Sequence, residues 1–300
     1  MVYDVIVVGG SFAGLSAGMQ LARAQRRVLL VDAGRPRNRF AAASHGFLGQ
    51  DGVAPEAVLS EGRRQLSAYP TLDFLQGEAV RVRSDDTFTV GLADGGAVEG
   101  RRLVLATGLI DDLPLPSMQM RWGVSVLHCP YCHGYEVRGR PLAVVASNPM
   151  SIHQALLLPD WGPTTLFTQG QFEPTLDEAG RLALRSVDVE RVPVVELLGD
   201  APHTEALRLA DGRIIAAQAV FTAPRTRMAS SLAEQLGCAF EDGPTGPYIQ
   251  VDAVKRTTIS GVFAAGDAAQ GMHNATLASA AGVLAGVSAH RSLVLAQAAA

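Results

Sequence analysis

The chain has 300 residues, of which 48% are hydrophobic and 18% are charged, and its formal net charge is −4. This composition predicts a globular protein with enough core for two domains and excludes a disordered chain. Basic residues are scattered apart from small clusters such as Arg35, Arg37 and Arg39, which excludes a nucleic-acid surface. No segment reaches the roughly 18 uninterrupted apolar residues of a membrane span, so we expect no membrane partner either.

The N-terminus has no basic segment before its apolar run, which argues against a secretory signal. Three cysteines are too few for a disulfide scaffold in a chain of this length. We therefore expect a cytoplasmic protein in which Cys129 and Cys132 have a chemical role.

The first 33 residues predict a β-α-β unit that binds a nucleotide. A buried strand, Val5 to Val8, leads through a glycine turn into an amphipathic helix, and a second strand ends at Asp32. The N–H groups at the start of such a helix bind a pyrophosphate, and the acid accepts hydrogen bonds from a ribose. The pattern G-x-G-x-x-G has Ser11 in place of its middle glycine, and serine is small enough to keep the turn functional.

Two later segments support the same domain. Residues 101–108, RRLVLATG, predict a strand that closes on a turn of small residues suited to passing beneath a bound dinucleotide. A strand from Val262 to Ala265 precedes Gly266 and Asp267, and a helix follows from about Asn274. The aspartate can bind a ribityl hydroxyl, and the helix N-terminus can face an electron-rich ring edge. Each segment alone also fits an ordinary buried strand, so their joint order is what indicates the site.

A second α/β domain is predicted between the proline-rich segments LPLP (113–116) and APRTR (223–227). It contains another strand-turn-helix pattern, RPLAVVASNPMSIHQALLL, and strands at TLFTQ, near Val192 to Leu198 and at Ala219 to Thr222. We therefore predict an α/β fold of two Rossmann-like nucleotide-binding domains, the second inserted in the first. The boundaries are 1–113 with 225–300 for the first domain and 114–224 for the second.

The stretch HCPYCHGYE, from His128 to Glu136, fits four chemistries. C-x-x-C-H is the spacing of a c-type haem attachment site, although attachment normally requires export. Two histidines and two cysteines could bind zinc, but adjacent residues such as His128 and Cys129 rarely converge tetrahedrally. CPYC also occurs in glutaredoxins, and the fourth option is a redox disulfide inside a flavoenzyme.

In the order of these motifs, the chain resembles the thioredoxin reductase group of FAD-dependent pyridine nucleotide-disulfide oxidoreductases over nearly all of its length. The resemblance implies FAD in the split first domain, a homodimer, and a redox disulfide Cys129–Cys132 that docks over the flavin. It therefore favours the fourth option for the CPYC segment, excludes glutaredoxin and leaves no metal site to expect.

The resemblance also assigns cofactor residues. Residues 9–14 would hold the pyrophosphate, and Asp32 with Ala33 would bind the adenosine ribose. Thr107 and Gly108 would form the turn beneath the cofactor. Asp267 would bind the ribityl chain, and the helix N-terminus at Asn274 and Ala275 would face the flavin. Asn38 and His45 lie in the place of a flavin-lining loop, and Val80 lies where the family stacks backbone on the adenine. The remaining positions are Gly9, Ser11, Phe12, Ala13, Gly14, Asp32, Ala33, Ala106, Thr107, Gly108, Gly266, Asp267, Asn274 and Ala275.

By the same resemblance Cys132 lies against the flavin and Cys129 exchanges with substrate sulfur. A free cysteine has a pKa of about 8.5, so exchange needs a neighbouring base. His133 stands where thioredoxin reductases have an acid, and it can move a proton at neutral pH. A solvent-facing or backbone-bonded role and a catalytic role are both open for His128. Cys238 is expected to be a buried hydrophobic residue.

The nucleotide site expected in the second domain is altered. Ala146, Asn148 and Ser151 occupy the family's glycine or alanine positions, Pro149 stiffens the turn, and residues 168–170 (TQG) replace the basic cluster that binds the NADPH 2′-phosphate. NADPH is therefore a doubtful electron donor, with weak binding of NADH or NADPH as the alternative.

These departures resemble a branch of the group that oxidises small-molecule dithiols and passes the electrons through FAD to O₂. Two alternatives stay open. One is a thioredoxin reductase-type disulfide reductase that uses NADPH weakly or takes electrons from ferredoxin. The other is a redox-sensing flavoprotein with little turnover. The expected partner is a small-molecule dithiol or disulfide, or a thioredoxin-like protein.

Overall fold

The computed structural model describes residues 1–148 and 150–298, so Pro149 and the stiffening that we expected from it lie outside the described residues. Two compact units are present. The first comprises Met1–Arg39, Glu56–Ile110 and Thr226–Ala300, and the second comprises Phe40–Pro55 and Asp111–Arg225.

The first unit is built around a sheet in the order β3-β2-β1-β6-β5-β4, in which β19 also pairs with β6. Its elements are β1 (Val2–Val8), α1 (Phe12–Arg23), β2 (Val28–Asp32), α2 (Pro55–Leu66), β3 (Leu72–Gln76), β4 (Ala79–Ser84), β5 (Phe88–Leu92), β6 (Ala97–Leu105), β7 (Leu109–Asp112), β16 (Arg225–Met228), α6 (Leu232–Gln235), β17 (Phe240–Asp242), β18 (Pro247–Ile249), β19 (Val262–Ala264), the 3-10 helix η3 (Gly266–Ala269) and α7 (Ala275–Ala298).

Strand β6 joins the N-terminal and C-terminal parts of this unit. One edge of β6 pairs with β1 in parallel along its length. The other edge pairs with β5 in antiparallel fashion over its first half and with β19 in parallel over its second half. The ends of β1, β2, β6 and β19 therefore come to one edge of the sheet, where nucleotides bind in this kind of fold.

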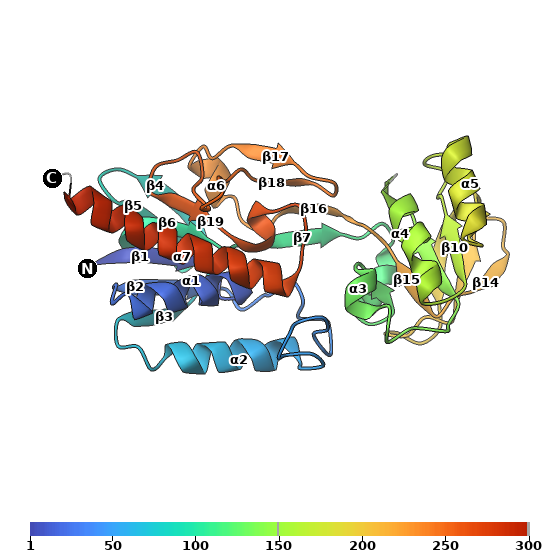
Figure 1. Cartoon of the computed structure of the whole chain (residues 1–300), viewed down its shortest axis with the longest axis horizontal. Helices are drawn as coiled ribbons and strands as arrows, with labels where there is room; N and C mark the ends of the chain where they lie inside the picture. Colours follow the sequence, from blue (N-terminus) through green and yellow to red (C-terminus); the bar gives the residue numbers. More distant parts are fainter. Residues whose placement is uncertain (149, 299–300) are drawn as a thin grey trace. The chain divides into compact units, whose positions relative to one another are not determined.

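Helices α1 and α7 lie side by side on one face of the sheet (Figure 1). Glycines allow this close approach, because a Cβ on Gly282 would lie 2.1 Å from the Ala13 carbonyl oxygen and one on Gly286 would lie 2.6 Å from that of Ala17. Helix α7 is long and apolar enough from Ala275 to Leu295 to meet the length and composition of a membrane span. Its face carrying Ala281, Ala285, Ala289 and Leu293 is instead buried in the core with α1.

The second unit contains a five-stranded parallel sheet in the order β11-β10-β9-β15-β8 and an antiparallel sheet β12-β13-β14. Its elements are the 3-10 helix η1 (Pro116–Arg121), β8 (Val126–Leu127), α3 (Pro130–His133), β9 (Leu142–Val145), α4 (Ser151–Leu157), the 3-10 helix η2 (Leu158–Asp160), β10 (Thr164–Phe167), α5 (Leu176–Leu184), β11 (Asp188–Glu190), β12 (Val194–Leu198), β13 (Ala206–Leu209), β14 (Ile214–Ala216) and β15 (Ala219–Phe221).

Alternation along β9 assigns the two faces of the parallel sheet. Val144 packs with residues of α4 and α5 on one face. Ala143 and Val145 pack with residues of β12 and β13 on the other. Both faces of the parallel sheet are covered, which explains why its strands are continuous apolar runs in the sequence.

The α/β architecture of two Rossmann-like domains is confirmed, since both units have parallel sheets with helices packed on them. One boundary differs from the sequence prediction, which placed residues 40–55 in the first domain. This segment groups with the second unit, because His45 lies 3.7 Å from the Glu136 carboxylate and the Phe40 backbone packs against Gly123.

Candidate active site

The turn between β1 and α1 has the shape of a dinucleotide cradle. Gly9 has a φ of 106°, and a Cβ there would lie 2.2 Å from the Ala106 carbonyl oxygen. A Cβ on Gly14 would lie 1.7 Å from the Gly9 carbonyl oxygen. Helix α1 starts at Phe12 with Ser11 as its N-cap residue, and no side-chain capping bond is made by Ser11. These glycines therefore let backbone segments pack closely at the N-terminus of α1. The N–H groups of a helix N-terminus bind anions, so this turn fits the diphosphate of FAD.

Asp32 lies beside this turn at the end of β2. Its carboxylate accepts the Gly10 N–H at 3.1 Å and pairs with Arg63 of α2 at 2.5 Å. A Cβ on Gly10 would lie 2.6 Å from the same carboxylate, so glycine is required for the acid to reach the turn. Ala33 follows it in an exposed position. Asp32 is thus placed to bind a ribose, and Arg63 is a partner that the sequence analysis did not identify.

The opposite side of the cradle comes from the strands β6 and β19. Ala106, Thr107 and Gly108 follow β6, and Gly108 has a φ of 70°. Gly266 follows β19 and packs against α1, since its Cβ would lie 2.9 Å from that of Ala13.

Asp267 stands directly after Gly266, and its carboxylate pairs with Arg37 at 2.8 Å. Sequence analysis singled out Arg37 as part of a basic cluster but gave it no function, because the two residues are 230 positions apart.

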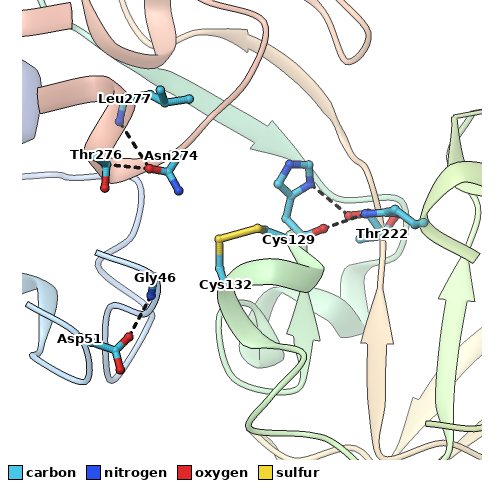
Figure 2. The surroundings of a disulfide bond; sticks show 10 residues. Gly46, Asp51, Cys129, Cys132, Thr222, Asn274, Thr276 and Leu277 are labelled. Carbon is cyan, nitrogen blue, oxygen red and sulfur yellow. Dashed lines mark hydrogen bonds between the residues drawn. A yellow bond between two sulfur atoms is a disulfide. The ribbon is translucent and has the colours of Figure 1, made fainter. Parts of the chain in front are cut away.

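Asn274 forms the N-terminal cap of α7, as Figure 2 shows. Its Oδ1 accepts the N–H of Thr276 at 2.8 Å and that of Leu277 at 3.4 Å. The helix itself begins at Ala275, one residue after the predicted start. These bonds satisfy two N–H groups of the first turn, which have no partner within the helix.

The three less specific cofactor candidates lie in different places. Asn38 is half-buried in a turn of the first unit. His45 belongs to the second unit, where its ring nitrogens lie 3.6 Å from Asp51 and 3.7 Å from Glu136. Val80 lies in β4, and its carbonyl oxygen accepts a hydrogen bond from Gln235.

Cys129 and Cys132 are joined in a disulfide at the start of α3, with their Cα atoms 5.3 Å apart (Figure 2). Cys129 is the N-cap residue of this one-turn helix, and Pro130 occupies its first position. Across residues 1–148 and 150–298, no group of three or more His, Cys, Asp and Glu residues is arranged to hold a metal ion. The pair is half-buried, so its sulfurs are constrained but not sealed in the core.

Histidines flank the pair on both sides. His133 is mostly removed from solvent, and this burial lowers its pKa, opposed by the nearby Glu136 carboxylate. The lowered pKa favours the neutral imidazole, which is the form that can accept a proton. Glu136 is a residue that sequence analysis missed, although it stands in the same HCPYCHGYE stretch.

His128 is fixed by two contacts from the second unit. Its Nδ1 lies 3.3 Å from the Thr222 carbonyl oxygen, and its own carbonyl accepts the Gln154 side-chain amide at 2.7 Å. The structure therefore shows a backbone contact for the His128 ring, and a catalytic role for this residue stays a prediction. Cys238 is buried in the first unit, as expected, and burial raises the pKa of its thiol.

In the turn after β9, where a second dinucleotide would bind, two polar side chains bond to backbone. The Ser147 hydroxyl and the Asn148 amide both donate to the Ala223 carbonyl oxygen, the latter at 3.1 Å. The side-chain oxygen Oδ1 of Asn148 accepts the Met150 N–H at 2.9 Å.

Comparison with known proteins identifies the relatives of this arrangement. The family model described as pyridine nucleotide-disulphide oxidoreductase matches residues 3–282. The chain belongs to this family. A curated relative named thioredoxin reductase tcpT, from Claviceps purpurea, is 29% identical over 98% of this chain and 95% of its own length.

Two solved structures match nearly the whole chain. An oxidoreductase from Agrobacterium tumefaciens is 47% identical with a TM-score of 0.94, covering 98% of this chain and 99% of its own. A protein named HlmI is 39% identical with a TM-score of 0.91, covering 99% of this chain and 94% of its own. The protein is therefore a thioredoxin reductase-like FAD-dependent oxidoreductase that acts on sulfur groups.

Proposed function

We propose that this enzyme oxidises a dithiol to a disulfide through the Cys129–Cys132 pair and FAD, with O₂ as the final electron acceptor. The observation that carries the proposal is how the polar side chains of the turn after β9 are bonded. In a dinucleotide-binding turn the backbone must approach a pyrophosphate, and here Ser147 and Asn148 turn their polar groups onto the Ala223 carbonyl instead.

The end of β10 supports the same conclusion. The residues there are Thr168, Gln169 and Gly170, none of which is basic. Gln169 is used structurally, because its side chain donates to the Val194 carbonyl at 3.1 Å and accepts the Val194 N–H at 2.7 Å. Recognition of an NADPH 2′-phosphate relies on charge-assisted contacts, and this segment offers none.

The reaction balances without a nicotinamide. One substrate thiolate attacks the Cys129 sulfur, the Cys129–Cys132 bond breaks, and Cys132 leaves as a thiolate. The second substrate thiolate then attacks the mixed disulfide, which releases the product disulfide and the Cys129 thiolate. When bound, FAD accepts the two electrons of the reduced pair and delivers them, with two protons, to O₂ as hydrogen peroxide. Neutral His133 is the group placed to accept a proton as the thiols ionise.

A second candidate is the reverse direction, in which reduced FAD delivers electrons to the pair and a disulfide or thioredoxin-like protein is reduced. The specific observation in its favour is the name of two curated relatives. Both are named thioredoxin reductase, and they are 29% and 25% identical over 98% and 97% of this chain. Weak use of NADPH, or electrons from ferredoxin, would supply this direction.

An anaerobic experiment separates the two. We expect millimolar NADPH or NADH to bleach the flavin absorbance far more slowly than a dithiol such as dithiothreitol, and dithiol turnover in air to consume O₂ and release equimolar peroxide. Stopped-flow bleaching by NADPH within a normal turnover time would establish the reductase direction instead. Flavin that neither reagent bleaches would point to a redox-sensing protein with little turnover.

A further inference from the structure

An arginine–aspartate pair lies beside the predicted cofactor cradle in the first unit. Arg37 Nη1 lies 2.8 Å from Asp267 Oδ2, and the two side chains are 18% and 19% exposed. An ion pair removed from solvent to this degree gains little net stability, because desolvation offsets the attraction. Because the Arg37–Asp267 pair lies beside the predicted FAD site, cofactor binding is the better explanation for it.

Asp267 is joined to a residue that packs on the start of α1. The preceding residue, Gly266, packs directly on Ala13, and Gly282 of α7 packs on the same residue. The start of α1 is where the two phosphates of a dinucleotide bind, and a helix N-terminus contributes only about half a positive charge. The first turn of α1, from Phe12, contains no basic residue. The negative charges of Asp267 and of a bound diphosphate therefore need a side-chain cation nearby.

Arg35 provides a contrast within the same RPRNR run. It pairs with Glu78 at 2.6 Å, but the two side chains are 61% and 49% exposed. Such a surface pair is solvent-screened and is worth little. Arg35 and Arg37 are two positions apart in sequence. Arg35 forms an ion pair at the surface, whereas Arg37 forms a mostly buried ion pair at the cradle.

We propose that Arg37 is a FAD-binding residue, oriented by Asp267, whose guanidinium neutralises the diphosphate of the cofactor. Asp267 then has two functions, since it holds the arginine as well as standing in the ribityl position. The proposal concerns the cofactor site alone and is independent of the direction of electron flow.

The test measures FAD affinity in Arg37→Gln, Asp267→Asn, the double variant and the control Arg35→Gln. FAD is removed and titrated back while its fluorescence quenching is followed at several salt concentrations. We expect Arg37→Gln to weaken FAD about 10- to 100-fold, the range for a hydrogen bond to a charged group, in both the wild-type and the Asp267→Asn background. The salt dependence of the affinity should also become shallower. Arg35→Gln should stay within about 2-fold of wild type.

A loss of less than about 10-fold in the Asp267→Asn background would overturn the proposal, because Arg37 would then serve only to neutralise Asp267. Where the FAD-free protein does not survive, the temperature at which the holoprotein releases fluorescent FAD replaces the titration. Circular dichroism melting of the same sample then distinguishes loss of FAD from loss of the fold. FAD release in Arg37→Gln at the wild-type temperature would likewise overturn the proposal.

Discussion

Replacing Gly14 with alanine tests whether the turn between β1 and α1 is the cofactor cradle. A Cβ at this position would lie 1.7 Å from the Gly9 carbonyl oxygen and 2.9 Å from the Gly9 carbonyl carbon. Both atoms belong to backbone, so no side chain can rotate away. Ordinary contact requires about 3.5 Å, and α1 must therefore move from β1 by more than about 1 Å.

The cost follows from what that movement disturbs. Helix α1 buries Leu15 and Leu21 in a core shared with α7, and overpacking such a core costs about 1–3 kcal/mol, occasionally more. We expect the upper end of this range, about 3 kcal/mol, because backbone blocks the new methyl group. For a unit of this size that corresponds to a fall in melting temperature of about 6–12 °C. FAD should be lost as well, since the amides at the helix start no longer face the diphosphate.

Gly18 of the same helix is the matched control. A Cβ there would meet only the ends of leucine side chains, the nearest being that of Leu72 at 3.2 Å, and alanine is a better helix former by about 1 kcal/mol. The assay is the flavin-to-protein absorbance ratio of purified protein together with melting by circular dichroism. The reasoning is refuted if Gly14→Ala binds one FAD per chain and melts within about 2 °C of wild type.

Three further outcomes are expected. Asp267→Ala should lower the FAD retained on purification while leaving the fold intact by circular dichroism, and full retention would remove this residue from the cofactor site. Cys132→Ser should abolish flavin reduction by dithiols, whereas Cys129→Ser should keep a Cys132 thiolate that gives a long-wavelength charge-transfer band; a band seen only in Cys132→Ser would reverse the two roles. Burial already lowers the pKa of His133 and Glu136 opposes that shift, so Glu136→Gln should lower this pKa further. If neutral His133 accepts the proton as proposed, the acid limb of dithiol-driven flavin reduction should then move to lower pH, and a move to higher pH would contradict this role.

The same pKa gives folding stability a pH dependence with a definite sign. At high pH His133 is neutral in both the folded and the unfolded chain, so it contributes no difference. Below its ordinary pKa of about 6.5 the unfolded chain takes up a proton that the folded chain does not, so stability falls with decreasing pH until the lowered pKa is reached.

Local sequence was sufficient to predict the parts of this protein that depend on near neighbours. The strand β1, the helix α1 and the strand β2 are continuous in sequence, and the apolar run, the glycine turn and the terminal Asp32 are all visible within 33 residues. The same holds for β19 with Gly266 and Asp267. Hydrophobic periodicity and turn chemistry act over a few residues, so each of these could be predicted from sequence alone.

Contacts between distant segments were decided only by the tertiary structure. Arg37 meets Asp267 across 230 positions, and Asn148 reaches the Ala223 carbonyl across 75. Residues 40–55 group with the second unit through His45 and Phe40, which their place in the sequence did not indicate. The strand order that brings β19 onto β6 determines which side chains share the cradle. The physical reason is that hydrogen bonds and ion pairs form wherever the folded backbone brings partners within about 3 Å, and sequence patterns contain no direct record of that approach.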